Sequence, residues 1–270
     1  MFKDSGSAIV NATRELFLHW RGLAIVAGLY LLLLAGLYLF VTTKEATRTQ
    51  VALTLVLSIA APMLFFTLQT ATAKFWTTKS GGKLIVNSLL NSWKLLLVTI
   101  PVVGISVLVI YGLNKLQGRF DVSNAGALVN VYALQAPTQA PRQLHWGTVA
   151  ITTARYLLLG VVTPLMLMHL WICTTRDGLR KSVRRAISQL KQTFATSSVL
   201  IYIAGFLVFA AVPYFLLNHK TTSTRPWLEL GLFTTKLIAV FCLTLFGWLI
   251  TVRALSTATA TATPDAVKGA

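Results

Sequence analysis

Six long runs of apolar residues divide the chain, and each is long enough to cross a lipid bilayer. They cover approximately 22–41, 51–72, 95–113, 153–173, 197–217 and 229–251. A helix needs about 20 mostly apolar residues to span the hydrocarbon core. The pattern therefore predicts an all-α fold, a polytopic membrane bundle of six transmembrane helices.

The tryptophans are placed near the ends of these runs, where their rings are expected to lie at the level of the lipid headgroups. They are Trp20, Trp76, Trp93, Trp146, Trp171, Trp227 and Trp248. Their positions support the boundaries of the six predicted spans.

A basic amphipathic segment, 179–194, stands directly before the fifth run. Its apolar residues recur at steps of three and four, which places them on one face of a helix; they are Leu179, Val183, Ala186, Ile187, Leu190 and Phe194. This pattern is typical of a helix that lies on an anionic membrane surface. Its cations are predicted to bind the lipid headgroups; they are Arg180, Lys181, Arg184, Arg185 and Lys191.

Two further segments, about 7–20 and 83–94, are predicted to be surface helices of the same kind. The triplet Ile9, Val10, Asn11 recurs at Ile85, Val86, Asn87, and an aromatic residue follows each Ile after eight positions. Ala186 and Phe194 have the same spacing, and glycines stand 19 positions after the three anchors, at Gly28, Gly104 and Gly205. We therefore predict three parallel repeats, each a surface helix followed by a hairpin of two spans.

Composition supports a membrane protein and indicates its lipid partner. Hydrophobic residues make up 55% of the 270 residues, charged residues only 11%, and the mean hydropathy is +0.70. The 24 Lys and Arg against 7 Asp and Glu give a charge of +17, and since the cations flank apolar runs, anionic lipid is a better partner than nucleic acid.

Orientation follows from the distribution of these cations. Of the 24 Lys and Arg, 15 fall on the side of the N-terminus and 9 on the other. The positive-inside rule then places both termini in the cytoplasm of a bacterial inner membrane, with the first span as an uncleaved signal anchor.

The chain is predicted to form a single membrane domain, 1–255, with one long outer loop, 114–146. Within this loop, LVNVYAL alternates in the manner of a short strand. The Ala- and Thr-rich tail, 256–270, is predicted to be disordered.

No motif for a soluble reaction is present: phosphate loop, nucleophile elbow and HExxH are all absent from the sequence. Apart from Glu229, the runs contain no Asp or Glu. Ion-coupled transporters, rotary stators and intramembrane metalloenzymes mostly need buried carboxylates or ligand clusters, so these classes lose support. We expect a protein that is not an enzyme and has no cofactor or metal.

Two intramembrane polar residues remain as candidates, His169 and Lys236. His169 shares a helical face with Cys173, four positions on, and with a Met sulfur they could form a soft metal site or supply an axial haem or chlorophyll ligand. The simpler interpretation is a hydrogen-bonded interfacial histidine. Lys236 is expected to extend to the outer interface, or to meet Glu229 or a phosphate.

Prolines interrupt four of the six runs, at Pro62, Pro101, Pro164 and Pro213. Segments such as LIVNSLLNSWKLLLVTIPVVG and RRAISQLKQTFATSSVLIYIAG, each leading into a span with a Pro or Gly near its middle, resemble those of uncharacterised bacterial six-span proteins of the glycerophosphodiester phosphodiesterase membrane-domain type. The resemblance covers most of the chain in layout. It implies a membrane domain without the catalytic barrel of that family.

Three functions follow from these patterns. The first is a non-catalytic accessory or scaffold subunit of a membrane complex, which binds anionic lipid and other membrane protein subunits. The second is a component of a lipid or small-molecule transporter or permease. The third is a cofactor-binding subunit of an electron-transfer or light-harvesting complex, which depends on His169.

Overall fold

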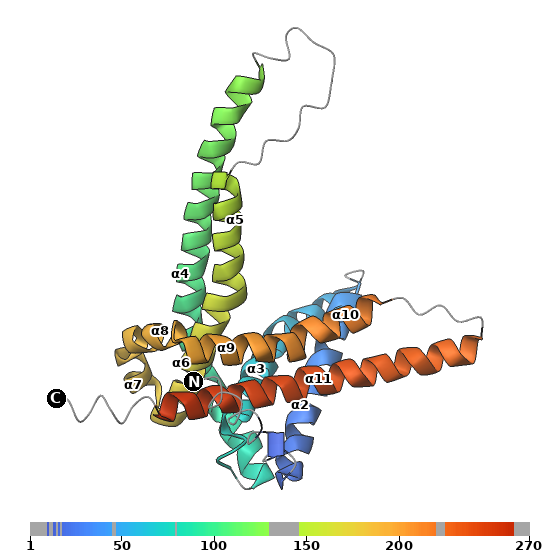
Figure 1. The fold of residues 1–270 in the computed structure, drawn as a ribbon. Helices are drawn as coiled ribbons and strands as arrows, with labels where there is room; N and C mark the ends of the chain where they lie inside the picture. The colour runs from blue at the N-terminus through green and yellow to red at the C-terminus, as the bar shows by residue number, and fades with distance from the viewer. Residues whose placement is uncertain are drawn as a thin grey trace, which may run out of the picture. The chain divides into compact units, whose positions relative to one another are not determined.

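The computed structural model describes residues 10, 13–14, 16, 18–44, 47–78, 80–129, 146–219 and 225–261, of which 119–129 and 259–261 are described by their backbone alone. All of the secondary structure in this part of the chain is helical (Figure 1). The elements are α2 (Trp20–Thr42), α3 (Arg48–Lys74), α4 (Gly81–Val129), α5 (Trp146–Leu157), η1 (Leu158–Val162), α6 (Thr163–Asp177), α7 (Leu179–Arg184), α8 (Ala186–Thr193), α9 (Thr196–Phe206), η2 (Leu207–Ala211), α10 (Val212–Asn218) and α11 (Pro226–Thr261).

Six stretches of helix in the described residues are long and apolar enough to cross a membrane. They are Trp20–Thr42, Arg48–Lys74, Gly81–Gly118, Trp146–Asp177, Thr196–Asn218 and Pro226–Ala258. Each contains one of the predicted runs, so the prediction of an all-α, six-span membrane protein is confirmed. The outward side chains of these helices are largely Leu, Val and Ile, which a water-soluble protein would not leave exposed over so wide an area.

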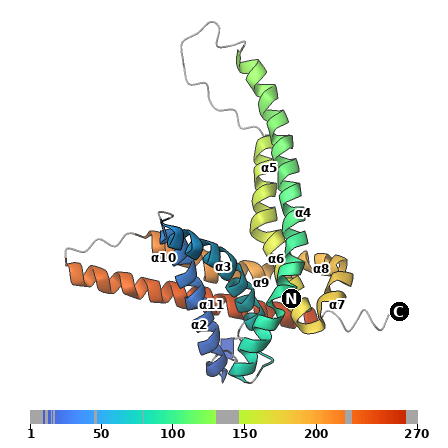
Figure 2. The ribbon, with the colours of Figure 1, turned by 180° about the vertical axis from the view of Figure 1, so that it is seen from behind.

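The helices divide into two compact units, 1–98 with 168–270 and 99–167. The first unit begins with a hairpin of α2 and α3, which lie side by side in both views (Figures 1 and 2). A capping box starts α3, because Gln50 N–H donates to Thr47 Oγ1 at 3.3 Å and Thr47 N–H donates to Gln50 Oε1 at 3.0 Å. The hydrophobic core of the unit joins this hairpin to the start of α4 and to α11 through Val26, Leu68, Leu84 and Leu249.

The second hairpin of this unit packs α9, η2 and α10 along α11. Two glycines make the close approach possible. A Cβ atom on Gly205 would collide with the side chain of Thr251, and one on Gly247 would lie 2.9 Å from Phe209 Cβ. Small residues at such crossings let helix backbones approach and gain dispersion contacts in the membrane.

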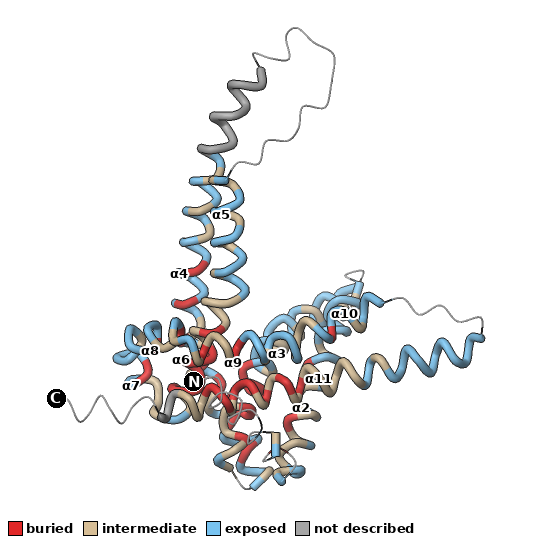
Figure 3. Tube along the Cα trace, viewed as in Figure 1, coloured by how far each residue is buried: buried red, intermediate tan, exposed pale blue. Residues whose placement is uncertain are grey.

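Burial is concentrated toward the C-terminal ends of α3, α6 and α11, as the red segments of Figure 3 show. Residues 66–72 of α3 and 168–174 of α6 are buried at every position. These helices are therefore surrounded by protein at that level. By contrast, α10 and the N-terminal part of α11 expose most of their side chains. Two tryptophans expected at the headgroups, Trp171 and Trp248, pack among these inner segments.

The second unit contains the later part of α4, α5, η1 and the start of α6. Ser106 and Thr163 share a hydrogen bond of 3.0 Å, and Arg155 donates to Asn114 Oδ1 at 3.3 Å. These two bonds tie α4 to the helix that follows the outer connection. Arg155 thus has a hydrogen-bond partner within its own unit.

The structure corrects three details of the sequence interpretation. The predicted surface helix at 83–94 is the first part of α4, which runs without a break from Gly81 to Val129. The same helix occupies 114–129, so the outer connection starts later than predicted, and the rest of the LVNVYAL segment lies outside the described residues. The predicted disordered tail is helical as far as Thr261.

Two of the four prolines stand two residues after the end of a π-helical turn. They are Pro164, after η1, and Pro213, after η2. Proline lacks an N–H and its ring clashes with the carbonyl four residues earlier, so a widened turn accommodates it. Pro62 and Pro101 lie within α3 and α4.

The three aligned repeats share a pattern of burial at positions counted from their first aligned residues, Ile9, Ile85 and Ala186. The residue seven positions after each anchor is buried, at Leu16, Ser92 and Thr193. The residue one position after each anchor is apolar and exposed, at Val10, Val86 and Ile187. Equivalent positions thus face the protein or its surroundings in the same way, which supports the prediction of a repeat. Half of the residues of the first predicted surface helix, 7–20, lie outside the described residues.

Candidate functional site

The basic segment begins with a sharp turn at the end of α6. Gly178 connects α6 to α7 with φ of 85° and ψ of 165°, a backbone conformation that is essentially restricted to glycine. The turn folds α7 back onto α6. Thr174 Oγ1 donates to Ser182 Oγ at 2.9 Å, and both residues are buried.

The predicted single helix at 179–194 is two helices, α7 and α8, with a break at Arg185. Arg185 has φ of −98° and ψ of 7°, and its guanidinium lies 3.5 Å from Asp177 Oδ2. Asp177 also accepts a hydrogen bond of 3.0 Å from Arg176 Nε. The acidic end of α6 therefore holds one cation of the basic segment at the point where the chain changes direction.

The polarity of α7 and α8 is reversed relative to a helix on the surface of a soluble protein. Their buried residues are polar, Ser182, Gln189 and Thr193. Their exposed residues include four apolar side chains, Val183, Ile187, Leu190 and Phe194. Four of the six apolar residues that the sequence places on one face are therefore exposed, from 38% for Leu190 to 76% for Ile187.

All five predicted headgroup ligands are exposed beside this apolar face; they are Arg180, Lys181, Arg184, Arg185 and Lys191. We call these five cations and the four exposed apolar side chains the α7–α8 surface. This surface therefore combines cations with outward apolar side chains. Asp177 is the one carboxylate that forms an ion pair with it among the described side chains.

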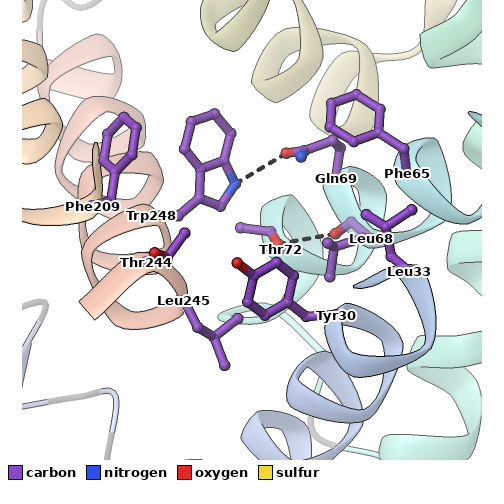
Figure 4. Close-up of a pocket in the computed structure, with 10 residues that line it drawn as sticks. All are labelled: Tyr30, Leu33, Phe65, Leu68, Gln69, Thr72, Phe209, Thr244, Leu245 and Trp248. Atoms are coloured by element: carbon purple, nitrogen blue, oxygen red, sulfur yellow. Dashed lines mark hydrogen bonds between the residues drawn. The ribbon is translucent and has the colours of Figure 1, made fainter. Parts of the chain in front are cut away.

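A separate cavity of about 200 Å³ lies within the first unit, between α2, α3, η2 and α11 (Figure 4). Its wall is largely apolar; the lining residues are Tyr30, Leu33, Phe65, Leu68, Gln69, Thr72, Phe209, Thr244, Leu245 and Trp248. The Trp248 indole donates to Gln69 Oε1 at 3.0 Å, which joins α11 to α3 across the cavity. No sequence motif predicted this site, because its residues come from four elements far apart in the chain.

His169 lies in the continuously buried part of α6 and is only 2% exposed. Neither of its ring nitrogens has a hydrogen-bond partner among the described residues. Cys173, predicted to accompany it, has its thiol 3.7 Å from Asp177 Oδ2. The described residues contain no group of three or more His, Cys, Asp or Glu that could hold a metal ion.

Lys236, the other intramembrane candidate, reaches back from α11 to the end of α10. Its ammonium donates to the backbone carbonyl of His219, the C-cap of α10. A cation at a helix C-terminus interacts favourably with the helix dipole. Lys236 and His169 are therefore not part of one site, and neither contributes to the α7–α8 surface.

Comparison with protein-family models, with curated proteins and with solved structures gives no match for this chain.

Proposed function

We propose that this protein is a non-catalytic subunit of a bacterial inner-membrane complex, an accessory or scaffold component that binds anionic lipid through the α7–α8 surface. In this arrangement both termini lie in the cytoplasm, and the outward apolar flanks of the six spans contact lipid and other membrane protein subunits. The basic segment then lies at the headgroups of the cytoplasmic leaflet.

The observation that carries the proposal is the reversed polarity of α7 and α8. Exposed Ile187 and Phe194 would be unfavourable in water, whereas the boundary between headgroups and acyl chains removes their apolar surface from water. The neighbouring cations meet lipid phosphates at the same depth, and each contributes up to about 1 kcal/mol on an anionic membrane.

Binding of lipid to the intact protein tests this function. The variant with Arg180, Lys181 and Arg184 replaced by Gln removes three exposed cations of the α7–α8 surface but leaves the Arg185–Asp177 pair in place. Native mass spectrometry of the detergent-solubilised protein, titrated with phosphatidylglycerol and phosphatidylcholine, should show weaker binding of phosphatidylglycerol alone.

The matched control replaces three exposed cations of the predicted outer side, Lys44, Arg48 and Lys115, with Gln. It lowers the net charge equally but leaves the α7–α8 surface unchanged, so its affinity for phosphatidylglycerol should equal that of the wild type. Equal losses in both variants would mean that net charge alone governs lipid binding, and the proposal would fail.

A component of a lipid transporter is the second candidate, and the apolar cavity between the α2–α3 hairpin and the hairpin that contains η2 and α11 favours it. A carrier of polar solutes is less well supported, because Trp248 is hydrogen-bonded to Gln69 and the Thr72 hydroxyl to the Leu68 carbonyl (Figure 4). Proteoliposomes that move a fluorescent lipid between leaflets faster than empty vesicles would support this second function.

A further inference from the structure

The cavity described above lies at the depth of the hydrocarbon core. Tyr30 stands ten residues after Trp20, the first residue of α2, which corresponds to about 15 Å along the helix axis. The hydrocarbon core of a bilayer is about 30 Å thick. The molecules that surround the cavity at this level are therefore lipid acyl chains.

Few polar atoms of the wall remain to form hydrogen bonds with a polar ligand. The Trp248 N–H donates to Gln69 Oε1, and the Thr72 hydroxyl donates to the Leu68 carbonyl at 2.9 Å (Figure 4). The Tyr30 hydroxyl faces Thr244 across the cavity. What the wall offers a ligand is aromatic and aliphatic carbon.

The volume of the cavity suits part of a hydrocarbon chain. An apolar cavity of about 150 Å³ inside a soluble protein stays dry and binds benzene, and the cavity here has about 200 Å³. One of its walls depends on the π-helical turn η2, which brings Phe209 edge-on to Trp248 with a centroid distance of 5.3 Å. π-Helical turns are frequent at functional sites.

Cations follow the cavity-lining residues of α3 and α11 toward the C-terminal end of each helix. Lys74 follows Thr72 by two residues in α3, and Arg253 follows Trp248 by five in α11. The Arg253 guanidinium lies 5.3 Å from the Trp76 ring centroid. A lipid phosphate at this end would meet positive charge.

We propose that the cavity between α2, α3, η2 and α11 is a binding site for one acyl chain of a phospholipid. The chain lies against Phe65, Trp248 and Tyr30, and the headgroup extends toward Lys74. This site uses none of the residues of the α7–α8 surface, so it goes beyond the proposed function.

Photocrosslinking in bilayers tests the site. The full-length protein is reconstituted in phosphatidylglycerol vesicles whose lipid carries a diazirine in the middle of one acyl chain, irradiated, and analysed by mass spectrometry. We expect adducts on Tyr30, Phe65 or Trp248. In Thr244→Phe, which fills the cavity, their yield should fall by at least about fivefold because an overfilled site excludes the chain.

The matched control is Thr235→Phe, the same change at an exposed position of α11, which should leave the adduct yield unchanged. Phe65→Trp narrows the cavity from α3 and replaces Thr244→Phe if that variant does not fold. A second arm uses unlabelled vesicles with a diazirine fatty acid. Adducts from the fatty acid alone, or equal yields in the filled variants and the wild type, would overturn the proposal.

The result of the photocrosslinking experiment does not depend on the proposed function. The Gln variants of the α7–α8 surface should retain the cavity adducts in full, because their substituted cations do not line the cavity. Loss of the adducts in those variants, with the cavity residues intact, would likewise overturn the proposal of a separate site.

Discussion

Replacement of the outward apolar residues Ile187 and Phe194 by Gln should release α7 and α8 from the membrane. Their exposed fractions are 76% and 62%. Complete removal of such a side chain from water contributes about 1.5–3 kcal/mol, so scaling by these fractions gives about 2–4 kcal/mol for the pair. The two residues make no hydrogen bond through their side chains, so the loss is that of apolar burial in lipid.

Hydrogen exchange of the intact protein in phosphatidylglycerol nanodiscs measures this effect. If docking on lipid stabilises the backbone hydrogen bonds of α8, a loss of about 2–4 kcal/mol should accelerate exchange in this segment by about 30- to 900-fold. Ser188→Gln, a change at an exposed polar position of the same helix, is the control and should leave the exchange rate unchanged.

Unchanged or slower exchange in the double variant would refute the reasoning. If α7 and α8 faced water, the polar side chains would be tolerated or favourable at these positions, because surface substitutions away from packed groups usually change stability by less than about 0.5 kcal/mol. The sign of the effect therefore decides whether the exposed face of α8 contacts lipid or water.

Four further predictions concern packing and are read from unfolding of the reconstituted protein. Gly178→Ala should destabilise it by about 1–3 kcal/mol, because the positive φ at this turn is strained for any other residue. Gly205→Ala should also destabilise it by about 1–3 kcal/mol, because the added methyl group would collide with α11. Gln69→Leu should cost about 1–3 kcal/mol by leaving the Trp248 N–H unpaired, and Gln69→Glu, which keeps an acceptor, should restore part of the loss. His169→Leu should be neutral or stabilising, since it removes a buried imidazole without hydrogen-bond partners among the described residues; a clear destabilisation, or visible absorption bands in the wild type, would instead favour the cofactor-binding alternative.

The apolar runs and the basic segment were readable from the sequence for a simple reason. The length and composition of a helix that crosses a bilayer are fixed by the thickness of the hydrocarbon core, so all six spans were located without knowledge of their contacts. The periodicity of 179–194 likewise identified which residues share a face. It did not reveal that Arg185 interrupts the helix, because periodicity contains neither the backbone angles at Arg185 nor its pairing with Asp177.

The direction in which each face points was decided by the tertiary structure. The sequence separates the polar from the apolar residues of α7, but only the packing of Ser182 against Thr174 in α6 shows that a polar side of α7 faces the protein. The cavity depends on tertiary contacts even more, since Gln69 and Trp248 are 179 positions apart in the sequence. Local patterns determine which helices form and which faces they carry, because periodicity is a property of neighbouring residues. Which faces meet is set by packing between distant segments, and a one-dimensional pattern does not contain it.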